Sequence, residues 1–245
     1  MSGAAGHARG TRGVPGVVSI VIPTYNEARA LPALLAQLER LGAVEAGCEV
    51  IVADGGSTDG TPDLVKPPCV LVQCGKRGRG AALNAGARAS CGEVLLFLHC
   101  DSVLPRDAIG ELRRVMHSHR AGCFGIRFDR RSPVLWLCQW FSNIRVVCRG
   151  LAYGDQGIFI DRSLFFAVGG FPDLPLMEDL QFSENLRERG VRIALARRRI
   201  VTSARRFQGG EVRKLRTWLS MVHLRRLYHE GVAAEELARL YRDQR

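Results

Sequence analysis

Hydrophobic residues in the first half of the chain follow two alternating patterns. Short continuous apolar runs rich in β-branched residues predict strands that a parallel sheet buries on both faces; these runs are residues 17–22, 48–54, 69–74 and 93–98. Pro23 is expected to end the first strand. The segments between the runs have apolar residues at helical spacing or are rich in alanine, which predicts helices over residues 28–41, 81–90 and 105–119. Strands that alternate with helices predict an α/β fold: a doubly wound, mostly parallel sheet with helices on both faces.

The second half of the chain is less regular. We expect two short edge strands at 191–195 and 198–203, and a helix that starts at Glu178 and has Gly190 as its C-cap. The other expected elements are strands at 122–128 and 158–161 and helices over 133–148, 212–230 and 233–242. Because no repeat or linker interrupts the pattern, we predict one domain over 17–211, with C-terminal helices in 212–245 packed on it. Residues 1–16 are small and glycine-rich and are expected to form a disordered tail.

Polar stretches follow all four strands predicted in the first half. They are PTYNE after the first strand, DGGSTDGT after the second, GKRGRG after the third and HCDS after the fourth. In a doubly wound sheet, ligands bind in the crevice at the carboxyl ends of the strands. Four polar strand ends on one edge therefore predict a functional site.

Each stretch also has a simpler structural explanation. Asp54 can bind a base or a ribose beside the small residue Gly55, or it can cap its own turn. Asn26 can cap the helix that follows it. The basic residues among the glycines of GKRGRG can hold phosphate, but their spacing matches neither the Walker A loop nor the dinucleotide fingerprint. A kinase or a dehydrogenase is therefore not expected.

Four motifs in this order resemble the family 2 glycosyltransferases of the GT-A fold. They are SIVIPTYNEARAL, VIVADGGSTDGT, FLHCDS and LMEDLQFSENLRERG, within residues 17–203. LHCDS, YGDQG and PLMEDLQFS further resemble a short subgroup that includes members associated with arsenosugar biosynthesis. The resemblance implies an inverting transfer of a sugar from a nucleotide-diphosphate-sugar, UDP- or GDP-linked, to a hydroxyl group of a small-molecule or lipid-linked acceptor.

The resemblance also implies residue roles. Asp179 would be the general base, with Glu178 beside it at the helix start. Donor binding would involve Pro23, Tyr25, Glu27, Asp54, Gly55, Lys76, Arg79, Asp101 and Arg206. Acceptor binding would involve Gly154, Asp155, Gln156 and Glu178. Because neighbours on a helix point about 100° apart, only one of the two acids of the MED motif is expected to face the site.

HCDS lies where the family places its Asp-x-Asp metal motif. A divalent cation, Mn²⁺ or Mg²⁺, would neutralise the diphosphate as it leaves. Asp101 can supply one carboxylate, but His99 stands in the first position, and an imidazole suits Mn²⁺ better than Mg²⁺. Asp101 alone, together with the diphosphate, is the other arrangement we consider. Cys100 is expected to point to the opposite side of the strand.

The charge is unevenly distributed along the chain. The net charge is +11, and residues 185–245 hold 16 Lys and Arg against 6 Asp and Glu. In the helix predicted over 212–230, an apolar stripe is surrounded by basic residues; the stripe consists of Val212, Leu215, Leu219, Val222 and Leu227. This helix can pack on the domain or contact an anionic membrane surface peripherally.

Other classes of function fit less well. Aromatic residues are too dispersed among the basic ones for a nucleic-acid stacking platform, so no nucleic-acid partner is expected. A nucleotidyltransferase would need a glycine-rich basic loop after the first strand, where PTYNE stands. A catalytically inactive relative is the remaining alternative, because the first metal-motif Asp is missing. Eight cysteines without a C-x-x-C pair favour a reducing, cytoplasmic location.

Overall fold

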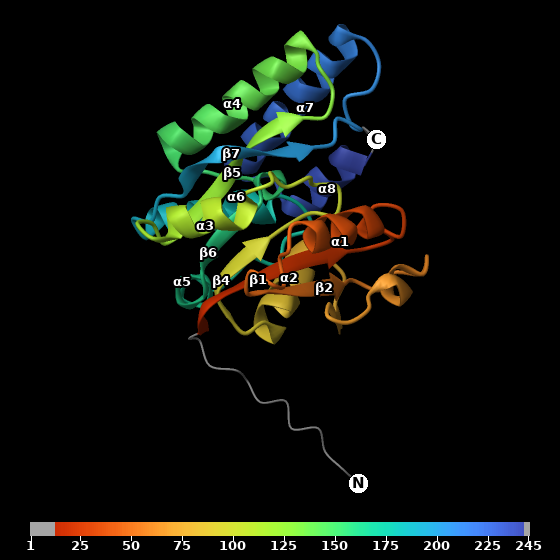
Figure 1. Ribbon diagram of the computed structural model, residues 1–245. Helices are drawn as coiled ribbons and strands as arrows, with labels where there is room; N and C mark the ends of the chain where they lie inside the picture. Colours follow the sequence, from red (N-terminus) through yellow and green to blue (C-terminus); the bar gives the residue numbers. More distant parts are fainter. Residues whose placement is uncertain (1–12, 243–245) are drawn as a thin grey trace.

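The computed structural model describes residues 13–242, and these contain one seven-stranded sheet in the order β3-β2-β1-β4-β6-β5-β7 (Figure 1). The strands are β1 (Val14–Thr24), β2 (Cys48–Asp54), β3 (Val70–Gln73), β4 (Gly92–Phe97), β5 (Ala121–Phe128), β6 (Ile158–Asp161) and β7 (Ala194–Thr202). Strands β3, β2, β1 and β4 are parallel to one another. Strand β6 is antiparallel to both β4 and β5, and β7 is parallel to β5. The mostly parallel α/β sheet predicted from the sequence is confirmed.

Helices cover both faces of the sheet. They are α1 (Leu31–Arg40), α2 (Arg79–Ala89), α3 (Ala108–Met116), α4 (Pro133–Arg149), α5 (Arg162–Ala167), α6 (Glu178–Glu188), α7 (Glu211–His229) and α8 (Ala234–Arg242), with short 3-10 turns η1 (Thr61–Leu64) and η2 (Gly154–Gln156). Alternate residues of β1 serve the two faces: Ile20 packs with α1 and α3, and Val21 packs with α2, α5 and α6. This explains why the strand is apolar at consecutive positions.

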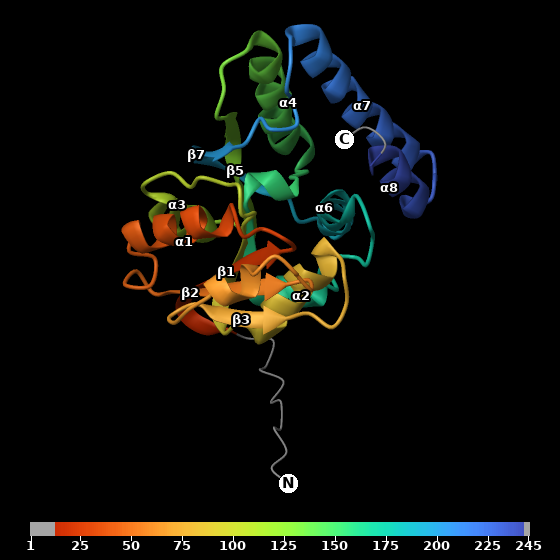
Figure 2. The ribbon, with the colours of Figure 1, turned by 90° about the vertical axis from the view of Figure 1, so that its right-hand side faces the viewer.

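The C-terminal helices lie at one end of the molecule (Figure 2). Helix α7 packs against α4 and α8. A small apolar cluster joins them to the loop before α6; its buried members are Leu151, Met177, Leu180, Leu224 and Leu237. None of the helices in residues 13–242 is long and apolar enough to cross a membrane.

Several predicted boundaries differ from the structure. Strand β1 begins at Val14, so residues 14–16 belong to the sheet, while residues 1–12 of the predicted tail lie outside the described part of the chain. The strand also continues through Pro23 to Thr24. The pairing of β1 with β4 ends at Val21, so beyond that point one side of the strand needs no backbone donor, and a proline is tolerated.

Three further differences concern helices and the second half. Helix α1 begins at Leu31 rather than at residue 28, with Ala30 as its N-cap. The two edge strands predicted at 191–195 and 198–203 form one strand, β7, at the edge of the sheet. Its exposed residues Arg197–Arg199 interrupt the apolar pattern, because an edge strand can turn side chains to solvent. Helix α5 was not predicted; its six residues are too few to show a helical period.

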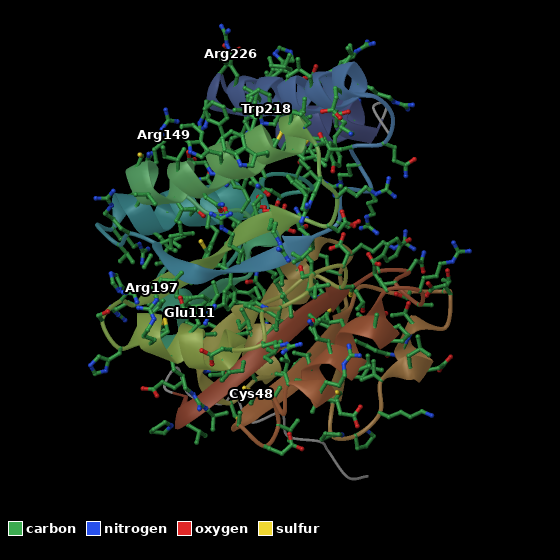
Figure 3. The ribbon with its side chains drawn as sticks, turned by 45° about the horizontal axis from the view of Figure 1, so that its top comes forward. Cys48, Glu111, Arg149, Arg197, Trp218 and Arg226 are labelled. Carbon is green, nitrogen blue, oxygen red and sulfur yellow. The ribbon has the colours of Figure 1, made fainter. Side chains whose placement is uncertain are left out.

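The Glu111 carboxylate links α3 to β7, and Glu111 and Arg197 lie side by side in Figure 3. It accepts hydrogen bonds from the Arg114 guanidinium at 2.8 Å and from the backbone N–H groups of Arg197 and Arg198. The side chain is only 5% exposed. Because β7 leads directly into the loop with Arg205, this anchor helps to position one side of the candidate site.

Glu111 makes the fold sensitive to acid. The hydrogen bonds from Arg114 lower the pKa of Glu111 from 4.5 to about 2, against the opposing effect of burial. The unfolded chain therefore takes up this proton at a higher pH than the folded protein does, so the stabilisation is complete above pH 4.5 and is lost as the pH falls toward 2. We expect Glu111→Gln to lower the free energy of unfolding at neutral pH by about 2–3 kcal/mol. Denaturant unfolding at neutral and acid pH measures this effect. If wild type and variant differed in their free energy of unfolding by the same amount at both pH values, the prediction would be contradicted.

Candidate active site

The predicted site residues meet at the carboxyl ends of β1, β2 and β4, next to the start of α2, the turn η2 and the start of α6. Parallel strands in adjacent positions bring their carboxyl ends to one edge, so residues far apart in the chain become neighbours.

The Asp54 carboxylate at the end of β2 organises its own loop. One oxygen accepts from the hydroxyl groups of Thr24 and Ser57, and the other accepts from the backbone N–H groups of Gly56 and Ser57 at 3.0 and 2.9 Å. Burial alone would raise the pKa of Asp54, but these hydrogen bonds lower it, so the group is ionised. The turn-capping role is therefore present in the structure, and the predicted donor contact is an additional role that stays a prediction.

The loop after β1 is fastened to the loop after β2. Asn26 adopts a left-handed conformation, with φ 54°, and its side-chain oxygen accepts from the Thr58 N–H at 2.9 Å. Asn26 thus joins two loops and does not cap α1. Tyr25 is half exposed beside this joint, and the guanidinium of Arg77 lies 5.4 Å from the centre of its ring. Pro23 lies two residues before Tyr25, and its carbonyl oxygen is 3.7 Å from the Cys100 sulfur.

Glu27 lies near the metal-motif turn. Burial raises its pKa, the charge of Arg205 lowers it, and the charge of Asp101 raises it. The charge of Asp59 raises it as well, so the charges of two other acids and one guanidinium reach Glu27.

The basic residues of the GKRGRG loop have protein partners. Lys76 forms an exposed ion pair with Asp173. Arg79, the first residue of α2, forms an ion pair with Glu178, whose side chain is 2% exposed. The predicted contacts of Lys76 and Arg79 with the donor stay predictions, because both side chains already serve to close the loop before α6 onto α2.

Gly80 allows this closure. A Cβ atom at Gly80 would lie 2.8 Å from the Pro172 carbonyl oxygen and 3.6 Å from the Glu178 side chain. The loop then reaches α6 through Met177, a buried residue with a left-handed φ of 67°. This left-handed backbone conformation costs energy in any residue other than glycine, and it is often found at functional sites.

At the start of α6, the Asp179 side chain points toward Gly154, whereas Glu178 pairs with Arg79. The Asp179 carboxylate accepts a hydrogen bond from the Gly154 N–H at 2.7 Å. A Cβ atom on Gly154 would lie 2.8 Å from His99 Nε2 and 3.3 Å from Asp179 Oδ2. Gly154 therefore separates an imidazole from a carboxylate, and only a glycine fits between them.

His99 is held neutral at this position. Burial and the charge of Arg79 lower its pKa to about 4, although Asp101 and Asp179 act in the opposite direction. A neutral imidazole has one ring nitrogen free to accept a hydrogen bond or to ligate a metal.

Residues 99–102 form a turn rather than a continuation of β4, because the Ser102 N–H donates to the His99 carbonyl at 3.1 Å. The alternating orientation expected for Cys100 therefore does not apply, and its sulfur faces Pro23. Asp101 forms an ion pair with Arg205 at 3.2 Å and is about a quarter exposed.

The residues of this site fit a cation only in part. Asp101 offers a hard carboxylate oxygen near the surface, and His99 offers a neutral nitrogen. Residues 13–242 contain no group of three His, Cys, Asp or Glu side chains arranged to hold a metal. A cation here would therefore need most of its ligands from the donor diphosphate.

The turn η2 is supported by an arginine within the molecule. Arg145 of α4 donates to Gln156 Oε1 at 2.8 Å, and its guanidinium stacks on the Tyr153 ring at 3.4 Å. Arg225 lies near the same ring, 5.2 Å from its centre. Gln156 is fully buried, and its Nε2 has no hydrogen-bond partner; Asp155 Oδ1 likewise has none. Burial raises the pKa of Asp155.

The two basic residues that follow β7 have different surroundings. Arg205 pairs with Asp101, whereas Arg206 lies 5.4 Å from the centre of the Tyr241 ring, and its predicted contact with the donor stays a prediction. Arg206 is still close enough for its charge to affect the pKa of His99. The support that Arg145 gives to η2 was not predicted from the sequence.

Comparisons with known proteins agree with this architecture. The profile described as "Glycosyl transferase family 2" matches residues 19–171. The probable glycosyltransferase YdaM of Bacillus subtilis is 27% identical over 195 residues, which cover 68% of this chain and 45% of YdaM. The PGL/p-HBAD biosynthesis glycosyltransferase of Mycobacterium bovis is 28% identical over 163 residues, 62% of each chain.

Solved structures share the fold. The mannosyltransferase PcManGT from Pyrobaculum calidifontis, in complex with GDP-Man and Mn²⁺, aligns with a TM-score of 0.64 and 23% identity over 96% of this chain and 71% of its own. S. aureus TarS 1–349 in complex with UDP-GlcNAc aligns with a TM-score of 0.62 and 19% identity over 79% of this chain and 59% of its own.

The chain belongs to glycosyl transferase family 2 and has the GT-A fold, as the sequence analysis predicted. It spans less than two thirds of the length of the curated relatives described above. The resemblance to the arsenosugar subgroup stays a prediction.

Proposed function

We propose that this protein transfers a sugar from a nucleotide-diphosphate-sugar to a hydroxyl acceptor, with inversion at the anomeric carbon. The observation that carries the proposal is the placement of Asp179. Its carboxylate lies beside Gly154 and close to His99, whose pKa is lowered by burial although the charges of both Asp179 and Asp101 oppose this. Family membership and neighbours bound to UDP-GlcNAc and GDP-Man support a nucleotide-sugar as donor.

In this reaction, the Asp179 carboxylate takes the proton of the acceptor hydroxyl as that oxygen attacks the anomeric carbon. The bond from the anomeric carbon to the diphosphate oxygen breaks, and its electrons leave with the nucleoside diphosphate. The Gly154 N–H holds Asp179 Oδ2 in place. Glu178, paired with Arg79, has a positioning role in this scheme: it fixes the start of α6, on which Asp179 lies.

The leaving diphosphate needs positive charge. Arg205 and Arg206 follow β7 at this edge and can supply it. A divalent cation, when bound through Asp101 and His99, would add charge to the same diphosphate oxygens. The Mn²⁺ bound with GDP-Man in a structural neighbour supports this part of the proposal.

Replacing Asp101 tests the cation and the donor together. We expect Asp101→Ala to weaken the Mn²⁺-dependent binding of UDP or GDP about tenfold or more, because the variant loses the carboxylate available at this turn. Calorimetric titration of both nucleotides, with and without Mn²⁺, measures the effect. Asp63→Ala, an exposed acid in η1, is the control and should bind like the parent. If Asp101→Ala keeps its full metal-dependent affinity, the cation is not bound at this turn.

The acceptor is the partner that the site defines least. We propose a small-molecule or lipid-linked hydroxyl compound, contacted by Gly154 and Asp155; Gln156 and Glu178, also predicted as contacts, are buried and would support these residues from behind. We further propose a cytoplasmic location, with peripheral contact at the inner face of a membrane. A screen of sugar nucleotides against hydroxyl acceptors of both kinds, followed by release of the nucleoside diphosphate, tests the reaction. If no donor shifts the melting temperature or is turned over, sugar transfer is not the function.

A further inference from the structure

Two helices outside the crevice carry most of the exposed apolar surface. Among the described residues, sixteen large apolar side chains are exposed, and nine of them lie on α4 and α7. These nine are Trp136, Trp140, Phe141, Ile144, Val147, Val212, Leu215, Leu219 and Val222. Trp136 is 60% exposed and Val212 is 84% exposed. Scattered exposed apolar residues need no explanation, but this concentration on two adjacent helices marks an interaction surface. We call it the α4–α7 surface.

The two apolar stripes face the same side of the molecule. Helices α4 and α7 start together, because the Ser132 hydroxyl donates to Glu211 at 2.7 Å, and they run in the same direction (Figure 2). They touch where the rings of Phe141 and Trp218 stack at 5.4 Å.

A helix turns about 100° per residue, so Trp140 lies about 100° to one side of Phe141 and Leu219 about 100° to the opposite side of Trp218. For parallel helices that touch through Phe141 and Trp218, these opposite rotations bring both stripes to one side. The exposed apolar residues therefore form a single surface that borders the stacked rings.

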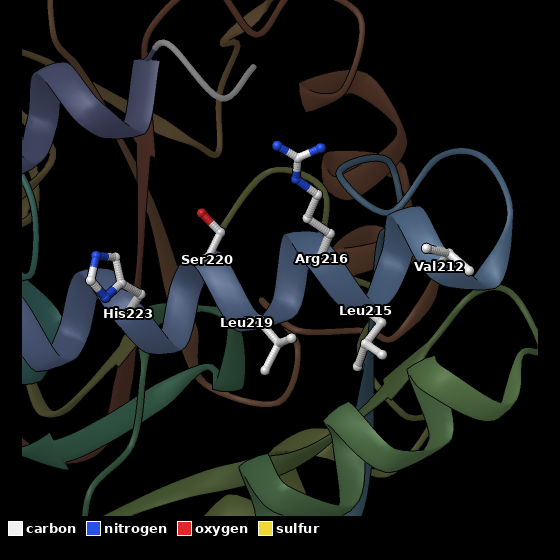
Figure 4. A pocket seen from close by; sticks show the side chains of 6 residues that line it. All are labelled: Val212, Leu215, Arg216, Leu219, Ser220 and His223. Carbon is white, nitrogen blue, oxygen red and sulfur yellow. The ribbon is translucent and has the colours of Figure 1, made fainter.

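The α7 half of this surface is an open groove (Figure 4). It has a volume of about 430 Å³ and is lined by Val212, Leu215, Arg216, Leu219, Ser220 and His223. In the close-up, Leu215 and Leu219 point to the side of α7 that faces α4, and Arg216 points to the other side. On α7, the apolar residues Leu215 and Leu219 therefore lie next to the basic residue Arg216.

The charge of these helices indicates the chemistry of the partner. Their exposed basic residues are Arg149, Arg213, Arg216 and Arg226, whereas Glu211 is the one acid within the two helices. Glu211 is already paired with Lys214. Arg149, Trp218 and Arg226 all lie at this end of the molecule (Figure 3). Pairing two copies of this face would bring like charges together, so a second copy of the chain fits poorly.

We propose that the α4–α7 surface docks on an anionic lipid bilayer. Tryptophans prefer the membrane interface, where an apolar ring and a polar N–H are both accommodated. Basic side chains beside the apolar stripe of α7, Arg216 and Arg226, can reach the lipid phosphates, and each adds to the attraction. This docking names the surface for the peripheral membrane contact proposed above, and it does not depend on the proposed sugar transfer.

The three tryptophans of the chain report directly on the contact. They are Trp136, Trp140 and Trp218, and all three belong to α4 or α7. With vesicles of phosphatidylcholine and phosphatidylglycerol at low salt, we expect co-sedimentation, a blue shift of the tryptophan fluorescence, and quenching by lipids with brominated acyl chains. Vesicles of phosphatidylcholine alone should bind at least tenfold more weakly. Added salt should release the protein.

Paired charge variants separate this face from general basicity. Arg216→Glu with Arg226→Glu should lower vesicle binding at least tenfold, because both side chains lie beside the apolar stripe of α7. Arg197→Glu with Arg198→Glu makes the same change in net charge on the edge strand β7, and should bind nearly as the parent does. Trp136→Ser with Trp140→Ser should lower binding about as much as the first pair. Because these side chains are exposed, melting temperatures should stay close to the parent value.

Three results would overturn the proposal. The first is an absence of co-sedimentation at low salt with the folded parent protein. The second is an equal loss of binding in the α7 and β7 charge pairs, which would reduce the effect to overall charge. The third is a salt-stable dimer in sedimentation velocity whose tryptophans are shielded from an aqueous quencher, which would assign the surface to a second copy. Donor binding measured on the same samples is independent of all three.

Discussion

Asp179→Asn is expected to lower the turnover number by a factor of about 10²–10⁴, which is the usual contribution of a positioned general base. The amide keeps the size of the side chain and can still accept from the Gly154 N–H, but it cannot take the acceptor proton. Binding of the nucleoside diphosphate should be nearly unchanged, because Asp101 and Arg205 are on another part of the site. Steady-state kinetics and calorimetry on the same preparation measure both effects.

Glu188→Gln is the matched control for this change. It also replaces a carboxylate by the corresponding amide, but at the exposed end of the same helix, and it should leave turnover and melting temperature unaltered. If Asp179→Asn transferred sugar at the parental rate, another group would have to accept the proton. If it lost donor binding as well, Asp179 would belong to the donor site.

Arg79→Met is expected to lower the free energy of unfolding by about 2–4 kcal/mol, because it leaves the buried Glu178 carboxylate without its partner. Burial raises the pKa of Glu178 and Arg79 opposes this, so the variant should also bind a proton at Glu178 more readily. The start of α6 then loses the contact that holds Asp179, and turnover should fall along with stability. Denaturant unfolding and kinetics give the two readouts.

Lys76→Met provides the comparison within the same loop. The Lys76–Asp173 pair is 65% exposed on both sides, and losing such a pair costs less than about 1 kcal/mol. Replacing both members of the buried pair, Arg79→Met with Glu178→Met, should recover part of the lost stability, because no charge remains buried. If Arg79→Met and Lys76→Met lowered the free energy of unfolding equally, the burial of Glu178 would not explain the effect of Arg79→Met.

Sequence patterns predicted most of the layers and their order. The run at residues 48–54 matches β2 at both ends, and residues 133–148 match α4 to within one residue. Both segments have a clear period, which is a local property of the chain. Prediction failed where the pattern was interrupted or too short, as at Arg197–Arg199 in β7 and in the six residues of α5.

The position of the site was also readable from the sequence, but its internal pairing was not. Polar residues after parallel strands must gather at one edge, so the location followed from the order of the elements. Which of Arg205 and Arg206 meets Asp101 depends on the direction in which the chain leaves β7. That direction depends on packing between α3, β5 and β7, including the Glu111 anchor.

By itself, then, the sequence determined the alternation of strands and helices, the family motifs and the chemical groups at the strand ends, because each depends on residues close together in the chain. Only the tertiary structure decided that Glu178 pairs with Arg79, that Asp179 faces His99 across Gly154, and that the apolar faces of α4 and α7 lie together. The physical reason is that these contacts join segments tens of residues apart, whose relative position is set by the packing of the whole sheet and its helices.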